Sequence, residues 1–171
     1  MGIRISILAL VVFASPALAG VIEGRVIEVP DGASLTVLSR EGASIHRIRL
    51  AGIDAPGKER ALAGRSRESL RRMAGGKSVR VETSTIDPRG LLVGIVLIQR
   101  NPAECRSKPC PEVFDPAVSQ LSAGLAVIDA PLLAQQTAEA RHVYATAQAK
   151  ARAARLGLWR EGFSNSAETS R

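Results

Sequence analysis

The chain has 171 residues, enough for one domain with a substantial hydrophobic core and a tight fit for two. Lysine and arginine outnumber aspartate and glutamate by 23 to 16, and the formal net charge is +7. This charge favours polyanionic partners, such as nucleic acid, anionic lipid or cell-envelope polymers, without choosing among them. The sequence has no G-x-S-x-G motif and no Cys-His arrangement, so nothing in it suggests acyl transfer.

The first 19 residues have the pattern of a secretory signal peptide. Arg4 gives a positive start, residues 5–14 form an apolar run, and Ala17-Leu18-Ala19 resembles a small-residue cleavage site. We expect cleavage after Ala19. A retained membrane anchor is the less favoured interpretation, because the run is shorter than the roughly 20 residues of a spanning helix. The mature protein is predicted to be periplasmic or secreted, with no membrane span.

Residues 21–98 predict five strands with one helix inserted. β-Branched residues in 21–29, the turn signal Pro30-Asp31-Gly32 and returning strands over 33–39 and 44–51 indicate a three-stranded meander. Residues 58–73 have helical spacing, and Gly75-Gly76 ends that helix. A fourth strand follows over 77–85. Residues 91–98 are apolar enough for a fifth strand that is buried on both faces.

The remaining residues predict helices. Residues 116–123 suggest a short helix ending at Gly124, and residues 125–128 a brief extended segment. Residues 132–156 predict one long helix with Gly157 as its C-cap and Trp159 folding back onto it. The tail over 161–171 is predicted to be disordered. This order describes an α+β domain over residues 20–160, an OB-fold five-stranded Greek-key barrel with C-terminal helices.

The two cysteines, Cys105 and Cys110, lie in a polar stretch rich in proline. In an oxidising compartment, such a close pair is expected to form one disulfide that pins a loop. A redox-active pair is the alternative, but the spacing is not C-x-x-C.

One strand end concentrates the polar residues of interest. Side chains alternate along a strand, so Arg47 and Arg49 share one face while Ile48 and Leu50 enter the core. Asp54 follows in a loop at the same edge. An arginine and a carboxylate placed there form either a phosphate-and-cation site or a simple surface ion pair. The helix over 58–73 adds an arginine-rich face that is either solvated or available to phosphates, with Arg60, Arg67 and Arg71 flanked by Arg65 and Arg72.

These motifs resemble the thermonuclease, or staphylococcal-nuclease-like, family over nearly all of the mature length. The resemblance is carried by Asp31-Gly32-Ala33-Ser34-Leu35, Ile48-Arg49-Leu50-x-Gly52-Ile53-Asp54-Ala55-Pro56, Asp87-Pro88-Arg89-Gly90, Gly124-Leu125-Ala126 and Gly157-Leu158-Trp159. It implies calcium-dependent cleavage of DNA and RNA phosphodiesters. In that chemistry, carboxylates hold the cation, a glutamate activates water and two arginines bind the phosphate.

Only two of the five functional positions implied by the resemblance are retained. Arg49 is the first phosphate-binding arginine, and Asp54 is a calcium ligand. The second aspartate of the family pattern Asp-Gly-Asp-Thr is Ala33, the glutamate after the proline is Gly57, and the second arginine is Leu91.

Two neighbours are candidate substitutes. Glu59 lies two residues beyond the lost glutamate, and Arg89 lies two residues before the lost arginine. Neither restores a carboxylate at Ala33, and a hard cation requires several oxygen ligands. We therefore expect poor calcium affinity with Asp54 as the one firm ligand, and no cofactor unless nuclease activity remains.

The sequence predicts an exported, non-catalytic nuclease-like domain that binds nucleic acid or other polyanions weakly and without sequence preference. The predicted anion-binding residues are Arg47, Arg49, Arg67 and Arg71. One alternative is a residual metal-dependent phosphodiesterase acting on DNA or RNA. Another is a periplasmic interaction module whose partner is an envelope protein.

Overall fold

The computed structural model describes residues 20–57, 61–99 and 113–161. The predicted signal peptide, Glu59, Arg60, both cysteines and nearly all of the predicted tail lie outside these ranges. Those predictions therefore stay untested. No helix within the described ranges is long and apolar enough to cross a bilayer.

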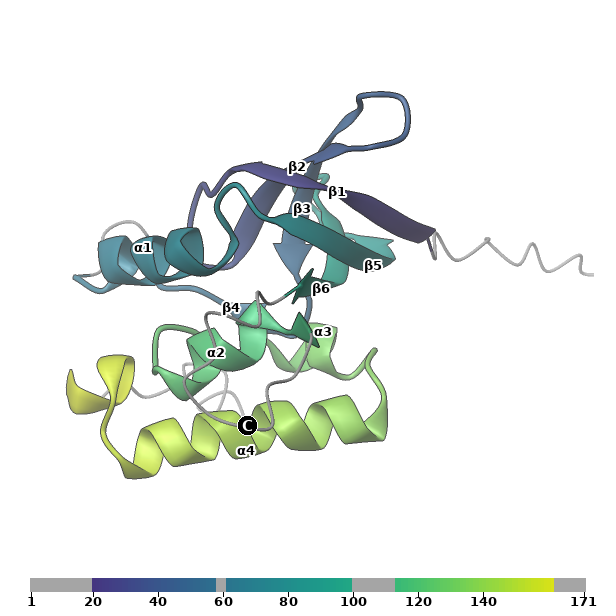
Figure 1. The fold of residues 1–171 in the computed structure, drawn as a ribbon. Helices are drawn as coiled ribbons and strands as arrows, with labels where there is room; N and C mark the ends of the chain where they lie inside the picture. Colours follow the sequence, from purple (N-terminus) through teal and green to yellow (C-terminus); the bar gives the residue numbers. More distant parts are fainter. Residues whose placement is uncertain (1–19, 58–60, 100–112, 162–171) are drawn as a thin grey trace, which may run out of the picture.

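Five strands form a closed barrel, as the sequence predicted (Figure 1). The strands follow one another as β3-β2-β1-β5-β6 with antiparallel neighbours, and a parallel pairing of β3 with β6 closes the ring. Their bounds are β1 Gly20–Glu28, β2 Ser34–Ser39, β3 Ile45–Leu50, β5 Ser78–Ile86 and β6 Leu92–Gln99. Two pairings of shorter strands complete the sheets. Strand β7, Val113–Phe114, pairs with the end of β6, and β4, Ile53–Asp54, pairs with β8, Val127–Ile128.

The barrel interior is filled by alternate side chains of each strand. Val37, Ile48, Leu50 and Val81 are fully buried, so the inward face predicted for β3 is confirmed. The prediction that the fifth strand is buried on both faces is wrong in part. Val96 and Ile98 on its inward face are buried, whereas Ile95 and Leu97 on its outward face are only half-buried.

Helices cover one end and one side of the barrel (Figure 1). Helix α1, Ala63–Ala74, turns Ser66, Leu70 and Ala74 inward and ends at Gly75, as predicted. It begins later than the predicted residue 58. Helix α2, Pro116–Ser122, is capped by Asp115, whose carboxylate also accepts a hydrogen bond from the hydroxyl of Tyr144. Helix α2 packs against helix α4, Ala138–Ala153.

The single long helix predicted over 132–156 is two helices. Helix α3 spans Ala130–Leu133, and α4 begins only at Ala138. The break has a local cause, because the Thr137 hydroxyl accepts a hydrogen bond from the Ala140 N–H and so starts a new helix there. Gly157 is not the C-cap of α4, which ends at Ala153; it begins a 3₁₀ helix, η2, Gly157–Glu161.

The end of the chain is fastened by two glycines in contact. A Cβ on Gly124 would collide with the Leu156 carbonyl oxygen, and a Cβ on Gly157 would collide with that of Gly124. Both residues have positive φ, 65° and 53°. The Leu158 N–H donates to the Gly124 carbonyl at 2.8 Å. As predicted, Trp159 folds back and is buried, and the Arg152 guanidinium lies 5.5 Å from its ring centroid.

A buried amide connects the barrel to two helices. The Gln120 side chain is fully buried, and its Nε2 donates to the carbonyl oxygens of Gly32 at 2.8 Å and Ser66 at 2.9 Å. The Ser66 hydroxyl donates to the Leu125 carbonyl at 2.7 Å. This network fixes the β1–β2 turn, which carries Asp31 and Ala33, against α1 and α2.

Replacing Gln120 should therefore destabilise the fold. Gln120→Leu keeps the volume but leaves the buried Gly32 carbonyl without this donor, so we expect the free energy of unfolding to fall by about 1–3 kcal/mol. Urea denaturation measures the change. Gln135→Leu, at an exposed position between α3 and α4, is the control. Equal losses in the two variants would contradict the structural role of the buried amide.

Candidate functional site

One cavity, of about 320 Å³, collects most of the residues that the sequence pointed to. Four of the five family positions line it: Ala33, Arg49, Asp54 and Gly57. Arg89, the candidate substitute for the lost arginine, lines it as well. The remaining residues of the wall are Asp31, Ser34, Ala55 and Pro56. The structure thus brings together residues from four segments: the β1–β2 turn, the end of β3, residues 54–57 and the β5–β6 turn.

Three elements position these groups. Strand β3 delivers Arg49 at its end, paired with Ser34 on β2 and with Val93 on β6. Strand β4 holds Asp54 through its pairing with Val127 on β8. In the β1–β2 turn, the Asp31 carboxylate accepts a hydrogen bond from the Ala33 N–H at 2.8 Å, which folds the turn back on itself.

The Arg49 guanidinium is surrounded by carboxylates. Its Nη2 lies 2.9 Å from Asp129 Oδ2 and 3.2 Å from Asp54 Oδ1, and its Nη1 lies 3.6 Å from Asp87 Oδ2. The Arg49 side chain is only 14% exposed. The surface ion pair between Arg49 and Asp54 that the sequence left open is therefore present, within a larger cluster. An incoming phosphate must compete with three aspartates for this arginine.

Asp87 organises the β5–β6 turn beneath the cavity. Its side chain is 2% exposed and accepts hydrogen bonds from the backbone N–H groups of Arg89 and Leu91, both at 2.9 Å. Arg89 Nε also donates to it at 3.1 Å. Burial alone would raise the pKa of Asp87, but the hydrogen bonds from Leu91 and Arg89 and the Arg89 charge outweigh it and lower the pKa. The carboxylate is held ionised between two arginines.

Asp129 is the site residue that sequence reasoning missed. Its Oδ1 accepts a hydrogen bond from the Leu132 N–H at 3.1 Å as the N-cap of α3, which leaves Oδ2 free to contact Arg49. An aspartate just before Ala130-Pro131 is a typical helix start, so the capping role could have been read from the sequence. Its approach to Arg49, 80 residues away, depends on tertiary packing.

The residues present do not fit the calcium ion that the family resemblance implies. Ala33 and Gly57 have no side-chain oxygen, and the carboxylate of Asp54 is engaged by Arg49. One oxygen of Asp31 is taken by the Ala33 N–H. Among the described residues, no three His, Cys, Asp or Glu side chains lie in an arrangement that could hold a metal. A hard cation would need more free oxygens than this cavity offers.

The other predicted anion-binding arginines lie outside the cavity. Arg47 is exposed on β3, Arg67 Nε donates to the Val29 carbonyl at 2.9 Å, and Arg71 forms two hydrogen bonds with Glu68, at 2.8 and 2.9 Å. Leu91 does not appear in the cavity wall. The four predicted arginines therefore do not converge on one point.

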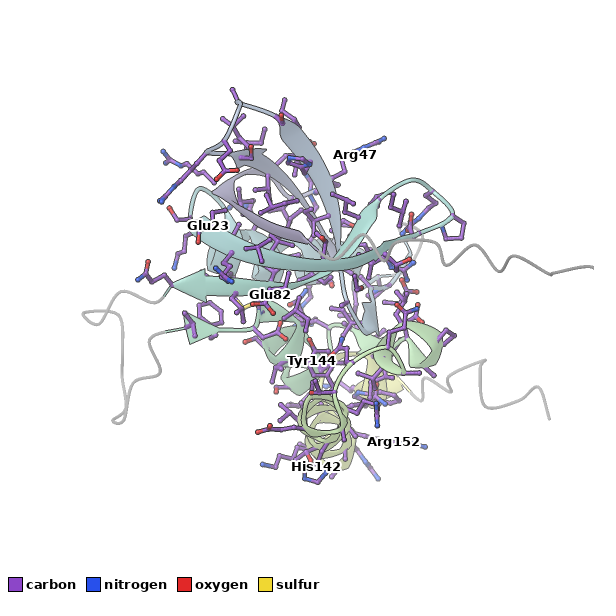
Figure 2. The ribbon with its side chains drawn as sticks, turned by 90° about the vertical axis from the view of Figure 1, so that its right-hand side faces the viewer. Glu23, Arg47, Glu82, His142, Tyr144 and Arg152 are labelled. Atoms are coloured by element: carbon purple, nitrogen blue, oxygen red, sulfur yellow. The ribbon has the colours of Figure 1, made fainter. Side chains whose placement is uncertain are left out.

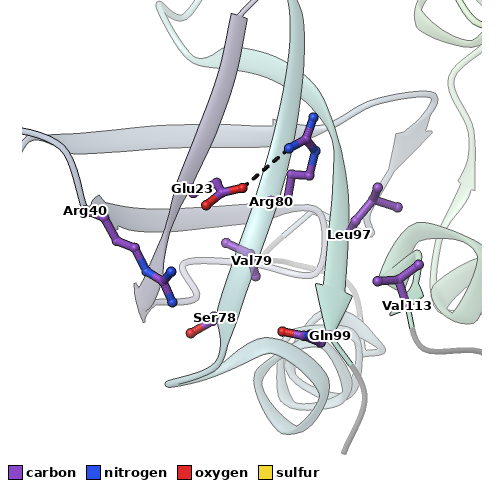
Figure 3. A pocket seen from close by; sticks show the side chains of 8 residues that line it. All are labelled: Glu23, Arg40, Ser78, Val79, Arg80, Leu97, Gln99 and Val113. Atoms are coloured by element: carbon purple, nitrogen blue, oxygen red, sulfur yellow. Dashed lines mark hydrogen bonds and ion pairs between the residues drawn. The ribbon is translucent and has the colours of Figure 1, made fainter.

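A second cavity, of about 240 Å³, lies on the outer face of β1 and β5 (Figure 3). Arg80 crosses it to pair with Glu23 at 3.4 Å, and Arg40, Ser78 and Gln99 line it. None of the predicted site residues belongs to this cavity, and the cation that spans it is neutralised by an adjacent carboxylate.

Comparison with known proteins gives a family match. A model of the staphylococcal nuclease homologue family matches residues 47–161, more than half of the chain. A protein of Escherichia coli O157:H7 named as an uncharacterized endonuclease is 36% identical over 89 residues, which cover 52% of this chain and 57% of that protein.

Two further relatives match over similar lengths. Protein ParB of Escherichia coli is 35% identical over 102 residues, 60% of this chain and 54% of that protein. An uncharacterized endonuclease of Haemophilus influenzae is 34% identical over 76 residues, 44% of this chain and 42% of that protein. The chain spans about half the length of the curated relatives it matches.

Neutralising Asp129 should release Arg49 for anions. Asp129→Asn removes one competing charge, while the amide oxygen can still cap α3, so we expect the affinity for inorganic phosphate to rise by about 3- to 10-fold. Isothermal titration calorimetry at low salt measures it. Glu139→Gln changes the net charge equally on an exposed position of α4. An equal rise in that control would mean that net charge alone controls affinity.

Asp87 should contribute stability that depends on pH. Because its pKa is lowered in the folded protein, its contribution is complete above the ordinary carboxyl pKa of about 4 and is lost as the pH falls through the lowered value. We expect Asp87→Asn to cost about 1–3 kcal/mol at neutral pH. Denaturant titrations of both proteins from neutral to strongly acidic pH should show the difference shrinking. A difference that stays constant with pH would contradict this assignment.

Proposed function

The chain belongs to the staphylococcal nuclease family, and we propose that it is a non-catalytic member that binds nucleic acid or another polyanion without sequence preference. The main support is the cavity at the end of β3. It gathers four of the family's site positions, yet positions 33 and 57 carry no side-chain oxygen. The retained Arg49 is already paired with aspartates.

The loss of catalysis follows from how such groups act. Removing one preorganised electrostatic group commonly lowers the rate of an enzyme by about 100- to 1000-fold. Here a cation ligand, the water-activating glutamate and one phosphate-binding arginine are absent together at Ala33, Gly57 and Leu91. Because these groups work as a unit, what remains should not turn over phosphodiesters at a useful rate.

Binding to nucleic acid is supported by ancestry and charge. Relatives of this chain are named as endonucleases, and the chain itself carries a net charge of +7. Attraction between surface cations and phosphates requires no base contacts, so the affinity should not depend on sequence and should weaken with salt. The signal-peptide pattern supports export, which would place this binding in the periplasm or outside the cell.

A residual phosphodiesterase is the second candidate function. The observation that favours it is the position of Arg89, which lines the same cavity as Arg49 and shares Asp87 with it. Two guanidinium groups could then contact one phosphate. This candidate still requires a group to activate water, and Glu59, the candidate substitute, lies outside the described residues.

Cleavage and binding measured on the same probes test the proposal. We expect the purified protein to retain fluorescent DNA and RNA at low salt and to lose them as salt rises. Cutting in calcium should not exceed that of an Arg49→Ala variant or of a sample with chelator.

Two results would contradict the proposal. Calcium-dependent cutting that the Arg49→Ala variant lacks would establish an active phosphodiesterase. Failure to retain either probe at low salt, combined with salt-insensitive capture of an envelope protein, would favour a protein-interaction role.

A further inference from the structure

We infer that the protein binds the backbone of a nucleic-acid duplex through its C-terminal basic patch, not through the ancestral cavity. The patch consists of Lys150, Arg152, Arg155 and Arg160, at the end of α4 and in the segment that follows it. All four side chains are exposed. This inference rests on the proposed function and assigns its surface.

The ancestral cavity is a poor place for a phosphate. Arg49 and Arg89 supply two positive charges there, but Asp31 and Asp54 line the wall and Asp87 and Asp129 contact Arg49. Four carboxylates against two guanidinium groups leave a net negative charge. In this partly desolvated setting, a phosphate would be repelled before it displaced an aspartate.

Helix α1 should attract phosphates less strongly than its number of arginines suggests. The Arg71 guanidinium makes two hydrogen bonds to Glu68, and the Arg67 Nε donates to a backbone carbonyl of the barrel. Arg65 and Arg72 are exposed on this helix, but the Glu68 carboxylate also interacts electrostatically with Arg72. Two of the four arginines of α1 are therefore already engaged by acceptors of the protein itself.

The C-terminal basic patch has few acidic residues near it in the sequence. Between Glu139, at the opposite end of α4, and Glu161, directly after the patch, the chain has no aspartate or glutamate. Among the side chains that the structure describes, which do not include that of Glu161, no carboxylate forms a salt bridge with the four patch cations. The Arg152 guanidinium already lies over the Trp159 ring. Binding a phosphate should therefore restrict this side chain little further.

The surface around the C-terminal basic patch is suited to a duplex. Figure 2 shows α4 end-on, with Tyr144 pointing toward the barrel and His142 and Arg152 pointing away from it. The exposed uncharged residues along this helix are mostly short: Ala138, Ala145, Ala149 and Ala153. Short side chains let a long, rigid polyanion approach the helix. Val143 and Leu156 are also exposed, but these two residues do not make the continuous apolar face of an interfacial membrane helix.

Aromatic residues decide between a duplex and a single strand. Single-strand binding without sequence preference uses exposed rings on which bases stack. Within the described ranges, Tyr144 and Trp159 are buried and Phe114 is half-buried against the core. With no exposed Phe, Tyr or Trp ring there, the contacts that remain are chiefly those to the phosphate backbone.

Three double variants that each remove two positive charges test this inference. Lys150→Gln with Arg155→Gln reduces the C-terminal basic patch and spares Arg152, which packs on Trp159. Arg47→Gln with Arg89→Gln removes the exposed cations on the cavity side, and Arg65→Gln with Arg72→Gln removes those of α1. All six side chains are exposed, so each variant should fold, which its thermal unfolding midpoint verifies.

We expect only the patch variant to lose binding strongly. Titration of a short fluorescent DNA duplex over a range of salt should give about a tenfold loss of affinity, and the slope of log affinity against log salt should become shallower by about 2. Equal losses in all three variants, or the largest loss in the cavity variant, would overturn the inference. So would patch-dependent binding to phosphatidylserine vesicles without binding to the duplex. If the unmodified protein binds single-stranded probes but not the duplex, the inference fails and the proposed function stands. If it binds neither, the proposed function itself fails.

Discussion

The parallel pairing of β3 with β6 is the contact on which the rest of this structure depends. It closes the barrel, and it sets Arg49 beside Val93, directly above the turn that carries Asp87. No short hairpin can join a parallel pair, so the chain between the two strands makes a long crossover that contains α1 and β5. The ion-pair cluster around Arg49 is a result of this closure, because its carboxylates come from three different connections.

Local patterns were enough to predict most of the fold. Alternation along residues 44–51 placed Ile48 and Leu50 in the core and Arg49 outside it, and the glycines at 75 and 124 marked the ends of helices. The break between α3 and α4 was missed because residues 132–156 favour helix throughout. A single hydroxyl cap at Thr137 decides where the second helix starts, and a propensity sum does not register it.

The candidate site, like the fold, could be predicted only in part from the sequence. The positions at 33, 49, 54 and 57 could be brought together from the resemblance, since each belongs to a short motif with a fixed place in the barrel. What surrounds Arg49 could not be predicted. Asp87 and Asp129 are a turn residue and a helix cap when read locally, and their common contact with one guanidinium depends on how distant segments pack. That contact converts a retained family arginine into part of an internal salt-bridge cluster.

The contact between Gly124 and Gly157 also bears on how the chain acquires its fold. The Leu158 N–H completes this contact, 158 − 124 = 34 residues after Gly124 in the sequence. A chain still emerging from the ribosome therefore cannot complete this contact until residue 158 has been made, although the barrel strands are available much earlier. The side of α2 that packs against α4 likewise stays uncovered until α4 itself has been made.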